Sequence, residues 1–131
     1  MMASAQSAPS KVLATVLLVE DEVLIRLMAA NELRKAGFTV IEAAHAREAL
    51  SVLRSATPVD VLITDIRMPG PIDGVQLATL ARELWPNLKI AIASAYTPQW
   101  PAVNVIDAFF GKPYNPDRMI ERITELLQGI K

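Results

Sequence analysis

The sequence contains no cysteine and a single histidine, His45, among its 131 residues. The absence of cysteine excludes a disulfide framework and thiolate metal chemistry, and it fits a reducing compartment. No apolar stretch reaches the ~20 residues that a membrane helix needs, and the start of the chain lacks the basic and apolar regions of a signal peptide. We therefore expect a cytoplasmic protein with no membrane contact, in which His45 is a solvated residue without neighbouring ligands.

The sequence also has little net charge, because its Lys, Arg, Asp and Glu residues sum to −1 and form no basic stripe. The chain therefore has no general electrostatic attraction to nucleic acid, and we predict no direct nucleic-acid binding. The length is that of one domain. The small and polar residues at the start are typical of a loose end. We predict a flexible tail over residues 1–13 and one domain over residues 14–131.

Five short apolar runs alternate with longer amphipathic segments. Most of the runs are apolar at every position, which is typical of parallel strands that helices cover on both faces. Apolar residues in the intervening segments recur at helical spacing. The alternation predicts a doubly wound α/β sandwich. The predicted strands cover residues 16–19, 39–41, 61–64, 90–93 and 108–110, and the four clear helices lie near residues 25–36, 46–53, 77–84 and 116–130.

Two helix predictions rest on specific residues. The last helix has Asn115 as an N-cap, Pro116 at its first position and Gly129 near its end. The segment 96–107 instead contains two prolines and has too few residues for a regular helix with its loops. We predict a short or distorted fourth helix there.

Polar residues follow four of the five predicted strands. In open α/β sheets, ligands bind beyond the carboxyl ends of the strands. The residues that come directly after these runs are Glu20, Asp21, Asp65, Ser94 and Lys112. Only the second predicted strand is followed by no clear polar site residue, which fits a strand on the outside of the sheet. The sequence therefore predicts one polar site at this edge.

The three acids of this predicted site need a cation. Two carboxylates 4 Å apart repel each other by about 4 kcal/mol at an effective dielectric constant of about 20. Few protein oxygens are available, so Mg²⁺ with waters completing its shell fits better than Ca²⁺. Lys112 adds an ammonium group. An acid, a metal, a lysine and a hydroxyl are the parts required for phosphoryl transfer to a carboxylate.

Four motifs, taken together and in this order, resemble the receiver domain of two-component response regulators, the CheY-like family, and specifically its stand-alone single-domain type. The resemblance covers the chain from about residue 14 to its C-terminus. It implies a flavodoxin-like (βα)5 three-layer sandwich with a parallel sheet in the order 2-1-3-4-5. The motifs are "LLVEDE" (17–22), "LITDIRMPGPIDG" (62–74), "IASAY" (92–96) and "FFGKP" (109–113).

The resemblance assigns the metal and acceptor roles residue by residue. Asp65 matches the phosphoacceptor, and Asp21 matches the acid that binds Mg²⁺ directly. Glu20 matches the acid that often holds the metal through water. The backbone carbonyl of Arg67 matches the third protein ligand. These positions imply a Mg²⁺-dependent phosphorylation of Asp65.

The resemblance also assigns the switch. Ser94 matches the hydroxyl that turns toward the phosphoryl group, Phe109 matches the switch aromatic, and Lys112 with Pro113 matches a Lys followed by a cis peptide. Ser94 and Lys112 would be drawn toward the new group, and Phe109 would rotate into the vacated space. The expected output is a changed surface around strands four and five.

Two departures from the family pattern concern loops. The stretch "MPGPIDG" carries one residue more than the commoner spacing, which lengthens the loop without moving the acid. The interval from Ser94 to Lys112 is shorter than in typical members, which puts the fourth helix in doubt.

Arg67 and Tyr96 each lie two residues beyond a site residue, where their side chains can shield the phosphoryl group from water. We therefore predict a long-lived phosphorylated form.

The leading function is a signalling switch that is not an enzyme beyond its own phosphorylation and dephosphorylation. Its expected partners are a sensor histidine kinase or a phosphotransfer protein and a downstream protein target. One alternative is a receiver-like interaction module that works without phosphorylation. Another is an aspartyl-phosphate hydrolase similar to the haloacid dehalogenases, which place a second acid where this chain has Arg67.

Overall fold

The central sheet has five strands, and all of its neighbouring strands are parallel. The structure is a computed structural model that describes residues 14–95 and 104–129. The strand order is β2-β1-β3-β4-β5, which confirms the predicted topology. The strands are β1 (Thr15–Val19), β2 (Thr39–Ala43), β3 (Val61–Thr64), β4 (Lys89–Ser94) and β5 (Ala108–Gly111).

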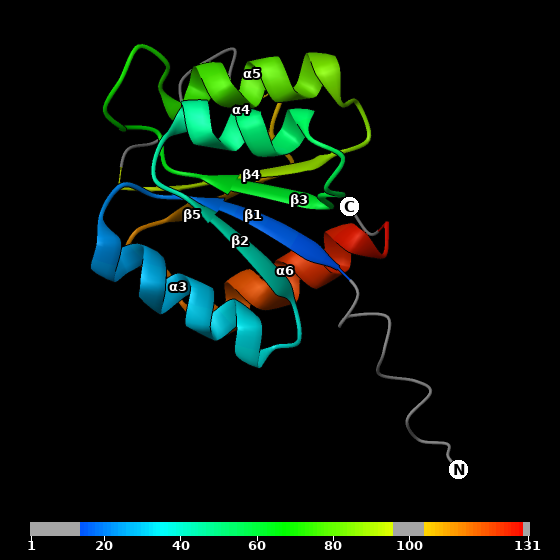
Figure 1. Ribbon diagram of the computed structural model, residues 1–131. Helices are drawn as coiled ribbons and strands as arrows, with labels where there is room; N and C mark the ends of the chain where they lie inside the picture. Colours follow the sequence, from blue (N-terminus) through cyan, green and yellow to red (C-terminus); the bar gives the residue numbers. More distant parts are fainter. Residues whose placement is uncertain (1–13, 96–103, 130–131) are drawn as a thin grey trace.

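Helices cover both faces of this sheet and make a three-layer sandwich (Figure 1). Helices α3 and α6 lie on one face, and α4 and α5 lie on the other. None of the described helices is both long and apolar enough to cross a bilayer. Their bounds are α3 (Val23–Lys35), α4 (Ala46–Arg54), α5 (Gly74–Leu84) and α6 (Pro116–Leu127).

The apolar strands divide the core into two halves because successive side chains of a strand point to opposite faces. Val16 and Leu18 of β1 belong to the half under α3 and α6. Leu17 and Val19 belong to the half under α4 and α5. Each such side chain contributes about 1.5–3 kcal/mol on full burial. The continuous apolar runs in the sequence therefore reflect strands that are buried on both faces.

The last helix begins as the sequence predicts. The Asn115 side chain accepts hydrogen bonds from the backbone N–H groups of Asp117 and Arg118, and Pro116 is the first helical residue. The helix ends at Leu127, and Gly129 follows with a φ of 82°. This end comes earlier than the predicted residue 130, because a left-handed residue cannot continue a helix.

The helical spacing of Ile25, Met28, Ala29, Leu33 and Ala36 predicts one apolar face for the first helix, and this prediction is wrong at Met28. Its side chain is 68% exposed. The buried residues of α3 are Ala29, Ala30 and Leu33, so the face that contacts the sheet is narrow. At about 100° per residue, Met28 lies about 140° around the helix axis from Leu33 and about 200° from Ala30, which places it outside this face.

Two predictions fall wholly or largely outside the described residues. The flexible tail over residues 1–13 lies outside them. Of the segment 96–107, in which we predicted a short or distorted fourth helix, the structure describes only residues 104–107, and these form no α-helix.

An arginine on α5 connects these last residues to the sheet. The Arg82 guanidinium donates to the carbonyl of Val105 at 3.0 Å, to the carbonyl of Leu88 at 2.9 Å and to the Asp107 carboxylate at 2.7 Å. Asp107 in turn accepts from the backbone N–H of Ile90 at 2.8 Å. The entry into β5 is thereby fixed beside β4, and with it the position of the residues that follow β5.

Candidate functional site

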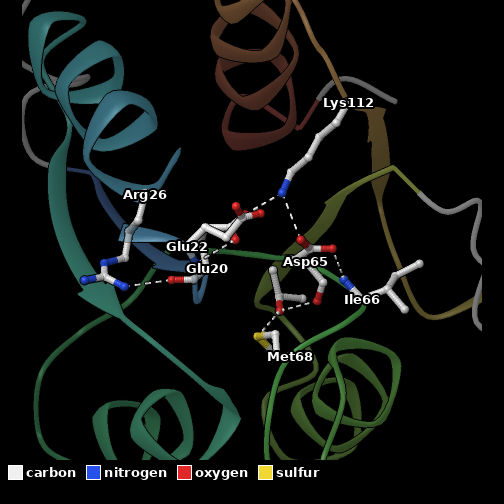
Figure 2. A network of polar contacts seen from close by, with 8 residues as sticks. Glu20, Glu22, Arg26, Asp65, Ile66, Met68 and Lys112 are labelled. Atoms are coloured by element: carbon white, nitrogen blue, oxygen red, sulfur yellow. Dashed lines mark hydrogen bonds and ion pairs between the residues drawn. The ribbon is translucent and has the colours of Figure 1, made fainter. Parts of the chain in front are cut away.

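Side chains from three strand ends meet at the carboxyl edge of the sheet. Glu20 follows β1, Asp65 follows β3 and Lys112 follows β5. Figure 2 shows the Lys112 side chain reaching between the two acids. Its ammonium Nζ forms an ion pair with the Glu20 carboxylate and another with Asp65 Oδ2 at 2.8 Å. The structure thus brings together three residues that are 45 or more positions apart, as the strand ends predicted.

Three acids form a cluster at this edge. One carboxylate oxygen each from Glu20, Asp21 and Asp65 lies within 4.8 Å of the others. Two oxygens bound to one Mg²⁺ ion are at most about 4.2 Å apart, since each Mg–O distance is about 2.1 Å. Neighbouring oxygens in an octahedral Mg²⁺ shell are about 3.0 Å apart, so these oxygens need to approach by up to about 2 Å if all three bind the ion directly, and by less if a water bridges one of them. Three anionic oxygen donors are the chemistry that Mg²⁺ prefers, and these residues fit it.

Glu20 is the most buried of the acids, with 4% of its surface exposed. Its Oε2 accepts a hydrogen bond from the backbone N–H of Glu22 at 3.1 Å. Burial raises the pKa of Glu20 above its ordinary value, although the hydrogen bond from Lys112 opposes the shift. A cation beside this carboxylate would favour its charged form.

Lys112 is also largely buried, with 16% of its side chain exposed. Burial by itself lowers the pKa of Lys112, but hydrogen bonds to Asp65 and Glu20 outweigh this effect and raise the pKa above its ordinary value. The side chain is therefore an ammonium at neutral pH. It places a fixed positive charge beside the Asp65 carboxylate.

Asp65 is held by main chain and side chain together. Its Oδ1 accepts from the backbone N–H of Ile66 at 2.6 Å, while its Oδ2 accepts from Lys112. The Thr64 hydroxyl, which is fully buried, donates to the Asp65 carbonyl at 2.9 Å and lies 3.8 Å from the Met68 sulfur. The carboxylate is thus oriented before any ligand arrives.

Gly74 packs directly against the backbone of Asp65. Its N–H donates to the Ile66 carbonyl at 2.7 Å. A Cβ atom built on Gly74 would lie 1.7 Å from the Asp65 carbonyl oxygen and 2.7 Å from its carbonyl carbon. These are backbone atoms, so they cannot turn away as a side chain can. Only glycine fits at the start of α5.

We expect Gly74→Ala to lower the free energy of unfolding by about 3 kcal/mol, because the backbone at Asp65 and Ile66 must move to admit the methyl group. Urea denaturation measures this. Gly70→Ala is the matched control: its Cβ would meet nothing within 4 Å, but its φ of 103° disfavours alanine. Equal losses in the two variants would mean that backbone strain, and not the contact with Asp65, sets the cost.

Ser94 and Phe109 lie on neighbouring strands. Ser94 is the last residue of β4 and is fully buried. Its carbonyl accepts from the backbone N–H of Lys112 at 3.0 Å, and it pairs with Gly111 in the sheet. Phe109 is 37% exposed, and a Cβ on Gly111 would lie 3.6 Å from its ring. Ser94 therefore lies beside Lys112, and Phe109, three residues before Lys112, is partly exposed to solvent.

The remaining predicted residues can be placed only in part. Arg67 lies in the turn after Asp65 and is exposed. Lys112 and Pro113 are joined by a cis peptide bond, which matches the expectation from the resemblance. Tyr96 lies outside the described residues, so its predicted position near the site is not tested.

Arg26 fixes the turn behind the acidic pair, and sequence reasoning did not find this role. Arg26 of α3 donates to the Glu20 carbonyl at 2.8 Å (Figure 2) and forms a 3.2 Å ion pair with Glu42 of β2. Arg34 forms a second ion pair with Glu42, at 3.1 Å. Arg26 therefore connects the turn that carries Glu20 and Asp21 to the outer strand. Its sequence neighbours are apolar and carry no motif that marks this role.

Comparison with known proteins identifies relatives with the same fold. A family model, described as the response regulator receiver domain, matches residues 16–124. The chemotaxis protein CheY of Thermotoga maritima is 32% identical over 116 residues, which cover 85% of this chain and 95% of that protein. A crystal structure of the Thermotoga maritima response regulator protein TrrA in complex with Mg²⁺ and BeF has 29% sequence identity and a TM-score of 0.81. The similarity covers 87% of this chain and 99% of that one.

Relatives also occur as parts of longer proteins. The sensor kinase CckA of Brucella abortus is 36% identical over 120 residues, which cover 88% of this chain but 13% of the kinase. The match to a putative NtrX-like response regulator of Rickettsia conorii, at 31% identity, spans 25% of that regulator. The chain thus corresponds to one module of these longer relatives.

Proposed function

Because this chain belongs to the response regulator receiver domain family of two-component signalling proteins, we propose that Asp65 accepts a phosphoryl group from a histidine kinase or a phosphotransfer protein. The observation that carries the proposal is the meeting of three acids and one lysine at the carboxyl edge of the sheet. A partner supplies the phosphohistidine, so this chain needs no histidine of its own.

Asp21 and Asp65 would hold the Mg²⁺ ion directly, together with the Arg67 carbonyl, and Glu20 would hold it through water. The bound ion would neutralise the acids and the incoming phosphoryl oxygens. An oxygen of Asp65 attacks the phosphorus, the bond from phosphorus to the donor nitrogen breaks, and a phosphorus–oxygen bond to Asp65 forms. Lys112 exchanges its contact with Asp65 for one with a phosphoryl oxygen. The Ser94 hydroxyl donates to another.

We propose that the phosphorylation of Asp65 changes the surface formed by β4 and β5. Phosphorylation adds charge and acceptor oxygens beside Ser94 and Lys112. Movement of Ser94 toward them frees space into which Phe109 can rotate from its exposed position. A downstream protein, or a further phosphotransfer partner, would then recognise the face formed by β4 and β5. Beyond its own phosphorylation and dephosphorylation, the chain would catalyse nothing.

A protein donor also fits the exposed surface of α3. This helix starts three residues after Glu20 and exposes four large apolar side chains: Val23, Leu24, Leu27 and Met28. Groups of exposed apolar residues mark contact surfaces more often than chance. The group lies next to the acidic turn, where a donor must approach.

Binding of a phosphoryl mimic tests the proposed site without a known partner. Fluorine NMR of the protein with beryllium fluoride should show bound fluoride resonances that require both Mg²⁺ and the Asp65 carboxylate. EDTA should remove them, and so should Asp65→Asn. Bound resonances that persist in either case would contradict the proposed site.

We further propose that Arg67 and Tyr96 slow the loss of the phosphoryl group by excluding water. Each lies two residues beyond a site residue, Asp65 or Ser94. Replacing either with alanine should increase the dephosphorylation rate several-fold, measured as the decay of phosphoprotein after the donor is removed. Arg118→Ala, an exposed change on α6, is the control. Unchanged decay in both variants would refute the shielding role.

A further inference from the structure

A groove away from the acidic site lies between α4, α5 and the loop over residues 69–72. The two helices run side by side over one face of the sheet (Figure 1). The groove has a volume of about 490 Å³, which is within the range of pockets that bind ligands. Leu50, Ile72 and Leu80 are its large aliphatic residues, and Pro69 and Pro71 line it from the loop. It therefore offers an apolar surface to a binding partner.

The α4 side of the groove is basic. Arg47 and Arg54 line it and are exposed, and within residues 14–95 and 104–129 neither forms an ion pair. Glu48, the only acid of α4, accepts a hydrogen bond from the backbone N–H of Ala44 at 2.6 Å. Asp73, at the end of the loop, accepts from the backbone N–H of Gln76 at 2.8 Å. The two guanidinium groups are thus available to anions from another molecule.

The spacing of the two arginines favours an extended anionic chain. They are seven residues apart on one helix, with Ser51 between them in the groove lining, so they lie about 10.5 Å apart along the axis. Three residues of a polyproline II chain span about 9.3 Å, and residues three apart point to the same side. Acidic side chains three positions apart would therefore reach both arginines. Apolar side chains of the bound segment would contact the floor of the groove, which is formed by Leu50, Ile72 and Leu80.

We propose that this groove binds an extended acidic segment of a partner protein, with one apolar side chain in the floor and two carboxylates on Arg47 and Arg54. This surface is separate from the β4/β5 face, so the inference goes beyond the proposed function. Charge-assisted contacts of a guanidinium with a carboxylate are among the stronger hydrogen bonds at protein surfaces.

The test uses a fluorescent peptide of four Asp-Leu-Pro repeats and the whole 131-residue chain. Fluorescence anisotropy should show saturable binding that weakens with added salt. The double charge reversal Arg47→Glu with Arg54→Glu should weaken it about tenfold or more, because two favourable contacts become repulsive. Arg118→Glu reverses the charge of an exposed arginine on α6 and should leave the affinity for the peptide unchanged. Ser51→Trp should block binding without changing the charge.

Location and specificity complete the test. Amide shifts in NMR spectra should change at α4 and residues 69–72 when the peptide is added. A peptide of four Lys-Leu-Pro repeats should not bind. The proposal is overturned if the acidic peptide does not bind, or if Arg118→Glu lowers the affinity as much as the double charge reversal does. It is also overturned if the amide shifts are confined to other surfaces, or if a single-stranded oligonucleotide binds the same groove as tightly as the acidic peptide.

Discussion

Lys112→Met is expected to separate metal binding from phosphorylation. Methionine keeps much of the length of the side chain but has no charge. The Lys112 ammonium now contacts both Glu20 and Asp65, so it competes with Mg²⁺ for the same anionic oxygens. Its removal should raise the affinity for Mg²⁺, because the acids lose a competing cation and their mutual repulsion grows. The rate of phosphorylation should move the other way.

The rate should fall because the ammonium is one of the two cationic groups available to the phosphoryl oxygens. Loss of one preorganised donor of this kind costs about a hundredfold in rate. Mg²⁺ titrations and the time course of phosphorylation by acetyl phosphate, at saturating Mg²⁺, measure the two effects. Lys89→Met, a change to a lysine at the opposite end of the sheet, is the control. A parallel fall of affinity and rate would contradict a direct role of Lys112 in transfer.

Asp21→Asn is expected to weaken Mg²⁺ binding by about tenfold or more, because an anionic oxygen donor becomes a neutral one in a site built from few protein ligands. Phosphorylation should then require much more Mg²⁺, and high Mg²⁺ should restore part of the rate. The Asp21 carboxylate lies within 4.8 Å of those of Glu20 and Asp65, so the loss acts on the shared ion.

The neighbouring acid provides the matched control for this change. Glu22→Gln removes the same charge one residue away, but Glu22 contributes only its backbone N–H to the site. Its Mg²⁺ affinity should change far less than that of Asp21→Asn. Equal losses in the two variants would indicate a general effect of negative charge and would argue against coordination by Asp21.

The main outline of the site follows from the sequence because parallel strands share one carboxyl edge. Continuous apolar runs identified the strands, and the residue after each run identified Glu20, Asp65 and Lys112 without any knowledge of side-chain geometry. The helix signals at Asn115 and Pro116 succeeded for a similar reason, since capping depends on a few adjacent residues. The predicted strand ends and the predicted start of the last helix therefore agree with the structure.

Other features depend on distances that no pattern in the sequence encodes. The contact of Gly74 with the Asp65 carbonyl requires the path of the loop between them. The brace from Arg26 to the Glu20 carbonyl and the contacts of Arg82 join residues through backbone oxygens, which carry no residue signature. The exposure of Met28 depends on how narrow the buried face of α3 is. These features are set by packing. Helical periodicity alone predicted a wider buried face for α3 than the structure has, because it included Met28.

The central claim is that Asp65 is a Mg²⁺-dependent phosphoacceptor, and intact mass tests it most directly. The protein is incubated with acetyl phosphate and Mg²⁺, and Asp65→Asn and an EDTA-treated sample are run beside it. We predict the addition of one phosphoryl group that disappears in both controls. No addition, under conditions that modify an established receiver, would contradict the claim and favour an interaction module that works without phosphorylation.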